Sequence, residues 1–160
     1  MEIINIYTDG AAKGNPGPGG YGIVLSYNKI QKELSEGFKL TTNNRMELLA
    51  VIIGLESIRE TGYKIIIYSD SKYVVDAVNK NWVFNWEKTS YKKKKNSDLW
   101  KRFLKIYRKH QVVLKWIKGH SGHSQNERCD QLAVQASLNK NLKTDTGYEL
   151  SLNSSSTLFD

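Results

Sequence analysis

The chain has 160 residues, enough for one domain with a sizeable buried core and too few for two independent cores. Hydrophobic residues make up 39% and charged residues 25% of the sequence, the balance of a soluble globular protein. No apolar run approaches the ~18 residues of a membrane span, and no basic leader precedes an apolar segment at the N-terminus. We therefore expect no membrane partner and no secretory signal. The single cysteine, Cys129, cannot form an internal disulfide, so a reducing cytoplasm is the expected location.

The formal net charge of +8 is concentrated in one segment. Between Lys88 and Lys109 there are ten Lys or Arg residues and one acid, Asp98, a local balance of +9 that leaves the rest of the chain at −1. A confined basic block is typical of a protein that binds a polyanion. A solvated lysine-rich loop would have the same composition, and charge alone does not separate the two.

The first part of the chain predicts strands. Residues 2–8 are rich in isoleucine and predict a buried strand. Residues 13–20, "KGNPGPGG", have the composition of a turn. Residues 21–27 and 32–39 are strand-like runs separated by a short connection, which predicts an antiparallel hairpin.

Helices and strands then alternate. Apolar residues at helical spacing predict a largely buried helix over residues 43–58, and a continuous apolar strand follows at 64–70. Ser71 is placed to cap a short helix that runs through Val78.

The last part predicts a helix over about 98–109, a strand over 111–118 and a loop, "GHSGHS". Ser124 and Glu127 form a capping box for a final helix. From Lys140 onward the apolar content is too low for packing, so a mobile tail is expected. A meander followed by helix-linked strands predicts an α/β fold, with a mixed sheet and helices on its faces.

Two similar segments, "IYTD" and "IYSD", each bring an apolar strand to an aspartate, Asp9 and Asp70. If these strands are parallel neighbours, both carboxylates meet at the sheet edge where ligands bind in open α/β sheets. Two such anions repel unless a cation intervenes, and Mg²⁺ prefers oxygen ligands. Taken singly, Asp9 before Gly10 could be a turn residue, and Asp70 with Ser71 could begin a helix cap.

Other candidates for this site have equally plain alternatives. Glu47 follows Asn44 by three residues, which also fits a capping box. Asp130 could belong to a solvated helix face. His120 lies in a glycine-flanked loop from which an imidazole could reach a reaction centre, although His123 is nearby and loop histidines are often without function.

Several longer stretches together resemble bacterial type 1 ribonuclease H, over about residues 3 to 148: "YTDGAAKGNPGPGGYG", "TTNNRMELLA", "YSDSKYV", "WIKGHSGHSQNERCDQLA" and "DTGY". The resemblance implies a ribonuclease H-like fold, with a five-stranded mixed sheet made of an antiparallel meander and two parallel strands. It also implies a catalytic domain over residues 1–148, and we expect a disordered tail over 149–160.

The function that the resemblance implies is hydrolysis of the RNA strand of RNA–DNA hybrids, leaving 5′-phosphate and 3′-hydroxyl ends. Two Mg²⁺ ions, for which Mn²⁺ substitutes in some enzymes, would activate water and stabilise the leaving oxygen. By resemblance, His120 assists proton transfer or product departure, and four acids hold the metal: Asp9, Glu47, Asp70 and Asp130.

The resemblance also implies how the hybrid is bound. Asn15 would contact the minor groove, while Thr42, Asn43 and Asn96 would hold a phosphate of the DNA strand, with little sequence preference. In the basic protrusion, aromatic rings would pack against sugars and bases and lysines would meet phosphates. Those protrusion residues are Trp82, Trp86, Lys88, Lys92, Lys93, Lys94 and Lys95. Thr42 and Asn43 could instead only cap a helix, and the tryptophans could anchor the loop in the core.

The sequence departs from the family pattern at two positions, and two other functions are alternatives to hybrid cleavage. Tyr91 stands where relatives have a tryptophan, and Leu40 stands where many have an arginine. A non-catalytic module that binds hybrids, and a resolvase- or integrase-like nuclease that acts on DNA, share these general features. A monomer is expected because no surplus apolar stripe is evident.

Overall fold

A computed structural model describes residues 2–119 and 122–157, with side chains up to Asn153. The strands and helices found in these ranges are β1 (Ile3–Ala12), β2 (Gly17–Tyr27), β3 (Ile30–Thr41), α1 (Asn43–Glu56), β4 (Lys64–Ser69), α2 (Lys72–Asn79), α3 (Trp82–Lys88), α4 (Ser97–Tyr107), β5 (Gln111–Trp116), α5 (Ser124–Ser137) and α6 (Thr146–Thr157). None of the helices described in these ranges is long and apolar enough to cross a bilayer.

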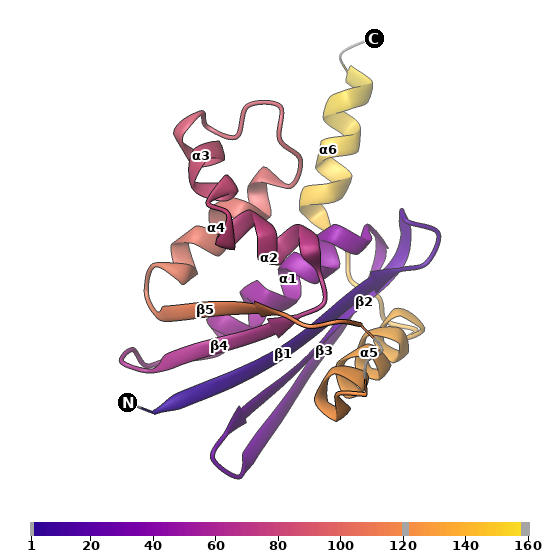
Figure 1. The fold of residues 1–160 in the computed structure, drawn as a ribbon. Helices are drawn as coiled ribbons and strands as arrows, with labels where there is room; N and C mark the ends of the chain where they lie inside the picture. Colours follow the sequence, from indigo (N-terminus) through magenta and orange to yellow (C-terminus); the bar gives the residue numbers. More distant parts are fainter. Residues whose placement is uncertain (1, 120–121, 158–160) are drawn as a thin grey trace.

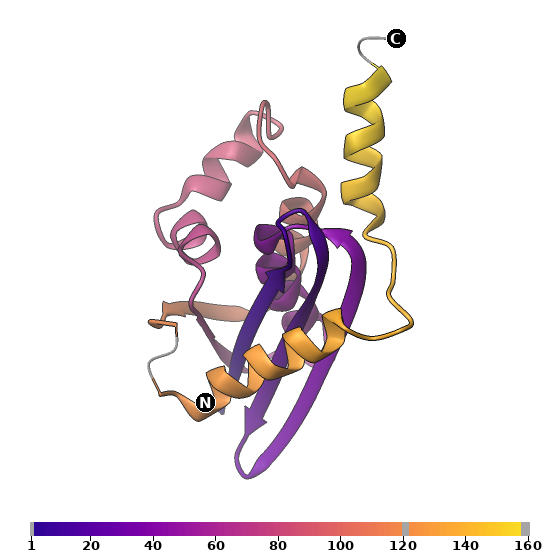
Figure 2. The ribbon, with the colours of Figure 1, turned by 90° about the vertical axis from the view of Figure 1, so that its right-hand side faces the viewer.

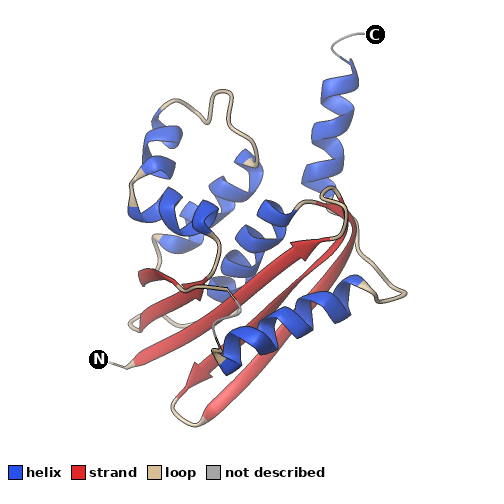
Figure 3. Cartoon of the chain, turned by 45° about the vertical axis from the view of Figure 1, so that its right-hand side comes forward, coloured by secondary structure: helices blue, strands red, loops and turns tan. Residues whose placement is uncertain are grey.

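The strands form one mixed sheet in the order β3-β2-β1-β4-β5 (Figures 1 and 3). β1, β2 and β3 pair antiparallel, whereas β4 pairs parallel with both β1 and β5. The predicted meander followed by parallel strands is therefore confirmed. Because β1 is central, it carries pairing partners on both sides and fixes the site that lies along it.

Helices cover both faces of the sheet, as predicted. Seen from the side in Figure 2, α5 runs alone across one face, and the other core helices lie behind the sheet. On that second face α1 packs against β1, and alternate β-strand residues such as Ile6, Ile67 and Leu114 are buried beneath it. Trp100 of α4 is fully buried in the same core.

The glycine-rich segment is turn or bend over residues 13–16, as predicted, but β2 already begins at Gly17. α5 lies so close to this part of the sheet that a Cβ atom on Gly20 would be 2.5 Å from the carbonyl oxygen of Ala133. Only a residue without a side chain permits that approach. The glycines from Gly17 onward therefore belong to a strand, and Gly20 lets α5 pack closely against it.

Helix boundaries show two further differences. α3 was not predicted, and it follows Asn81, whose φ of 62° places it in the left-handed region. α5 begins at Ser124 with His123 as its N-cap, and no side-chain capping bond is found there, so the predicted box between Ser124 and Glu127 is wrong.

The C-terminal segment forms α6, although the sequence suggests no regular structure after Lys140. Asp145 starts the helix: its backbone oxygen accepts from the N–H of Glu149 (3.0 Å), and its carboxylate binds the core. The buried ion pair of Asp145 with Arg45 and the backbone hydrogen bonds of Lys143 to β3 thus hold a segment with little apolar content. The predicted domain boundary after residue 148 falls within this helix.

Candidate active site

The repeated segments lie side by side. β1 and β4 pair in parallel with Tyr7 opposite Tyr68, and the two rings stack with centroids 4.9 Å apart. This register places Asp9 next to Asp70, as predicted. β1, however, continues past Asp9 to Ala12, so Asp9 lies within a strand, and its interpretation as a turn residue is wrong. What ends near Asp9 is the parallel pairing, so both carboxylates lie at the same edge of that pairing.

Asp70 does not serve as a helix cap. β4 ends at Ser69, and the hydroxyl oxygen of Ser71 accepts a hydrogen bond from the N–H of Val74 (3.2 Å), so Ser71 caps α2. The prediction for Ser71 is confirmed, and the alternative for Asp70 is wrong.

Glu47 reaches the same place from α1. The predicted box between Asn44 and Glu47 is wrong, because Thr42 is the N-cap and its hydroxyl accepts from the N–H of Arg45 (3.2 Å). α1 crosses β1 at Gly10, where a Cβ atom would lie 2.4 Å from the carbonyl carbon of Met46. Glycine at this position lets the first turns of α1 lie against the strand and present Glu47 beside the strand aspartates.

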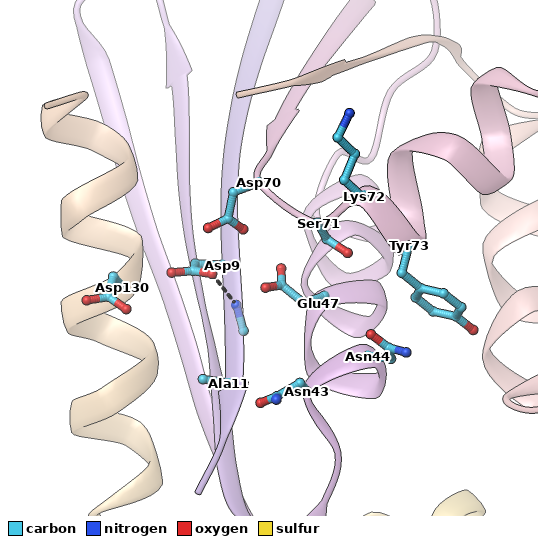
Figure 4. Close-up of a pocket in the computed structure, with 11 residues that line it drawn as sticks. Asp9, Ala11, Asn43, Asn44, Glu47, Asp70, Ser71, Lys72, Tyr73 and Asp130 are labelled. Atoms are coloured by element: carbon cyan, nitrogen blue, oxygen red, sulfur yellow. Dashed lines mark hydrogen bonds between the residues drawn. The ribbon is translucent and has the colours of Figure 1, made fainter. Parts of the chain in front are cut away.

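Three carboxylates converge in Figure 4. One oxygen each from Asp9, Glu47 and Asp70 lie within 4.8 Å of one another. Asp130 faces them from α5 and lines the same cavity, of about 430 Å³, without joining that tight group. The four acids predicted from the sequence therefore share one cavity, three of them in direct proximity.

The cluster is electrostatically strained. Burial, and next the charge of Asp70, raise the pKa of Asp9 to about 7, although the N–H of Gly10 donates to Oδ1 of Asp9 (2.9 Å). Burial and the charge of Asp9 raise the pKa of Glu47 well above its usual range. Within the described residues, Oε2 of Glu47 is buried without a hydrogen-bond partner. Buried, crowded carboxylate oxygens of this kind fit a hard divalent cation, which would favour their ionised forms.

Three further residues line this cavity that were not singled out from the sequence: Asn44, Lys72 and Tyr73. Nζ of Lys72 lies 4.2 Å from the centroid of the Trp116 ring. All three fall inside the motifs "TTNNRMELLA" and "YSDSKYV", which was the available signal. Their type alone gave no reason to select them.

The residues predicted to bind substrate near α1 have internal partners. Oδ1 of Asn15 accepts from the N–H of Asn43 (2.9 Å), and Oδ1 of Asn43 accepts from the N–H of Ala12 (2.6 Å). Thr42 caps α1, as the alternative interpretation held. These bonds fix the loop between β1 and β2 against the start of α1.

Asn96 is also held in place. Its Oδ1 accepts from Nη1 of Arg45 (3.3 Å), and its Nδ2 donates to the hydroxyl of Tyr73 (3.0 Å), which also accepts from Nε1 of Trp100 (2.9 Å). Asn96 and Tyr73 thus connect the acidic cavity with the start of α4.

The predicted basic protrusion comprises α3 and the loop that follows it. Trp82 is 43% exposed, whereas Trp86 packs edge-to-face against Trp100 with ring centroids 5.7 Å apart. The anchoring interpretation is therefore confirmed for Trp86, whereas Trp82 is exposed and its contact with a ligand stays a prediction. Tyr91 is buried. The lysines of this segment are all exposed: Lys88, Lys92, Lys93, Lys94 and Lys95. His120 lies outside the described residues.

Comparison with known proteins gives one consistent family. The family model described as RNase H matches residues 1–138. A protein named Ribonuclease H from Trichodesmium erythraeum (strain IMS101) is 54% identical over 151 residues, covering 91% of this chain and 96% of the relative. A protein named Ribonuclease HI from Shewanella oneidensis is 49% identical, covering 93% of this chain and 96% of the relative.

Solved structures agree with this match. The crystal structure of LC9-RNase H1, a type 1 RNase H with the type 2 active-site motif, has a TM-score of 0.79 at 29% identity and covers 88% of this chain and 74% of its own. LC11-RNase H1, solved in complex with an RNA/DNA hybrid, has a TM-score of 0.63 at 28% identity and covers 83% of this chain and 95% of its own.

Proposed function

Because this chain belongs to the ribonuclease H family, we propose that it is an endoribonuclease that hydrolyses the RNA strand of RNA–DNA hybrids. The expected products carry 5′-phosphate and 3′-hydroxyl ends. One observation carries the proposal: β1, α1 and β4 bring three carboxylates within 4.8 Å of one another in a cavity open to a large ligand. A cluster of this kind neutralises itself by binding divalent cations, and those cations in turn attract a phosphodiester.

We propose Mg²⁺ as the resident metal, two ions per site, with Mn²⁺ as a substitute. Asp9, Glu47 and Asp70 would hold the metal, with Asp130 contributing from α5. When bound, the ions would activate the attacking water and stabilise the leaving 3′ oxygen. By family resemblance, we assign His120 to proton transfer or product departure.

The protein's own residues supply position. The rigid strands β1 and β4 fix Asp9 and Asp70, and the approach permitted by Gly10 fixes Glu47 beside them. A scissile phosphate in this cavity would be bound at one defined place, and such orientation accounts for a large part of phosphoryl-transfer catalysis.

Duplex recognition is assigned to the surface around the cavity. Asn43 lines the acidic cavity, and a neighbouring cavity is lined by Asn15, Thr42, Asn96 and two lysines of the protrusion, Lys94 and Lys95. These groups meet backbone atoms, which gives affinity without sequence preference. Reading of the 2′-hydroxyl distinguishes RNA from DNA.

We also propose that the enzyme acts as a cytoplasmic monomer. Cys129 is fully buried, and burial, the larger cause, raises the pKa of its thiol to about 12, so the thiol is inert at neutral pH. Because this is the single cysteine of the chain, no internal disulfide forms, and the protein fits a reducing compartment.

A cleavage assay tests the proposed function. The full chain is incubated with labelled RNA–DNA hybrid, double-stranded RNA or double-stranded DNA, each with Mg²⁺ or with EDTA. We expect cleavage of the hybrid alone, only with Mg²⁺, and only in its RNA strand. Cleavage of duplex DNA would favour a resolvase-like nuclease, and binding without cleavage would favour a non-catalytic module.

Matched variants identify the residues responsible. Asp70→Asn should abolish cleavage while hybrid binding persists. Asp76→Asn removes a carboxylate on α2 that pairs with Lys80 (3.8 Å) outside the cluster, and it should cleave like the parent. Full activity of Asp70→Asn would refute the assigned site.

A further inference from the structure

A second cavity, of about 750 Å³, lies beside the acidic one. Four separate segments line it: the loop between β1 and β2 at Asn15, the start of α1 at Asn44, the loop before α4 at Lys94 and Lys95, and α6 at Tyr148 and Ser151. Asn44 lines both cavities, so they meet at the start of α1. In Figure 1, α6 and the loop between α3 and α4 rise at the same end of the molecule.

α6 is attached to the domain at its first turn. The carboxylate of Asp145 accepts from Nε of Arg45 (2.7 Å) and from the hydroxyl of Thr41 (2.7 Å). Further along, Leu150 is 59% exposed and Leu152 is 44% exposed. Figure 2 shows the helix projecting from the domain.

Packing against the domain does not account for the length of α6. A twelve-residue helix rich in Ser and Thr is marginal in water, because its nucleus is costly and its residues have low helix propensity. Tyr148, Ser151 and Leu152 of this helix form one wall of the second cavity.

The charge of the cavity indicates what this wall faces. Arg45 and Asp98 also line the cavity as an ion pair at 2.7 Å, and because Arg45 pairs with Asp145 as well, these three groups together carry a formal charge of −1. Lys94 and Lys95 then leave it with net positive charge. Asn15, Thr42 and Asn96 add polar groups. This lining suits a sugar–phosphate backbone, whose anionic oxygens pair with lysine and whose sugars contact apolar side chains.

We propose that α6 is an additional wall of the hybrid-binding groove, and that Tyr148, Ser151 and Leu152 contact the backbone of the bound duplex beyond the cleaved phosphate. The inference rests on the proposed function, since it concerns the same ligand. It extends substrate binding to a segment in which the sequence pattern predicts no role.

Charge variants on α6 test this. Ser151→Glu and Ser151→Lys alter a residue that lines the cavity, and Asn153→Glu and Asn153→Lys make the same changes two residues on, at a position outside the lining. Hybrid affinity is measured by fluorescence anisotropy with EDTA at 0.15 M salt, where charge effects fall off over about 8 Å. Circular dichroism checks that each variant keeps its helix content.

We expect Ser151→Glu to weaken hybrid binding roughly fivefold and Ser151→Lys to strengthen it by a similar factor. Both Asn153 variants should stay within about twofold of the affinity of the parent and should cleave hybrid like the parent. Opposite signs at position 151 separate a contact from unfolding of α6, which would weaken binding in both variants.

Equal effects at positions 151 and 153, weakening by both Ser151 variants, or no effect at 151 would overturn the role of α6 while the parent still cleaves hybrid. A parent chain that neither binds nor cleaves hybrid would instead refute the proposed function itself. The two failures are therefore distinguishable.

Discussion

Asp9, a proposed metal ligand, lowers the free energy of unfolding of the metal-free protein at neutral pH and above. It is 7% exposed, and burial followed by the charge of Asp70 raises its pKa to about 7. Between about pH 4 and pH 7, the folded protein without metal holds a proton on Asp9 that the unfolded chain has released. The contribution of Asp9 to the free energy of unfolding is therefore complete at low pH and is lost as pH rises.

Asp9→Asn removes this titration while keeping an oxygen that can accept from Gly10. In EDTA at pH 8, we expect the variant to be more stable than the parent by about 1–3 kcal/mol, with the difference vanishing near pH 4. Urea denaturation of both proteins across this range measures it. A variant that is less stable than the parent at pH 8 would contradict the strained cluster.

Arg45 has a structural role, because it connects helices of the fold and does not belong to the acidic cluster. Its guanidinium donates to Asp145, Asp98 and Asn96, which joins α1 to the segment preceding α6 and to the start of α4. Arg45 is 3% exposed and Asp145 is 8% exposed. Removing one partner of such a pair leaves an uncompensated buried charge.

Arg45→Met should lower the free energy of unfolding by about 3–5 kcal/mol. Arg102→Met is the matched control, because Arg102 also makes a two-pronged pair, with Glu56, but is 45% exposed. That control should cost about 0–1 kcal/mol. Chemical denaturation at pH 7 gives both values, and similar costs for the two variants would show that burial does not set the strength of the Arg45 network.

The elements also show how far the sequence reaches. Apolar runs predicted all five strands and the core helices, and the "IYTD" and "IYSD" echo predicted the adjacency of Asp9 and Asp70, because register follows the chain pattern. The Arg45 network joins residues about one hundred positions apart, which no local pattern encodes. α3 follows a left-handed Asn81, and β2 includes glycines that only the closeness of α5 explains. The distance of Asp130 from the carboxylates of Asp9, Glu47 and Asp70 depends on the position of α5, which no local sequence pattern predicts.

At the scale of the whole molecule, the clustered acidic side chains and the lysines of the protrusion lie in different places. The acidic cavity lies at the ends of the central strands, and the exposed lysines of the protrusion lie on helices and loops beside it. A duplex that contacts both would be held by phosphate contacts whose strength depends on salt through counterion release.

Replacing Lys93, Lys94 and Lys95 with Gln should reduce the slope of log affinity against log salt by roughly 0.7–0.9 for each lysine that meets a phosphate. The control variant replaces Lys29, Lys32 and Lys64 with Gln. These lysines lie towards the opposite end of the sheet, so the variant loses the same net charge but should keep nearly the parent's slope. Hybrid binding titrated at several salt concentrations gives both slopes. Equal slopes for the two triple variants would assign the protrusion lysines to a solvated loop.

Binding of a divalent cation by the clustered acids is the central claim, and anomalous diffraction from crystals of the full chain soaked in Mn²⁺ tests it most directly. We expect metal density bounded by carboxylate oxygens of Asp9, Glu47 and Asp70. Metal bound only elsewhere, with these three carboxylates unliganded, would contradict it.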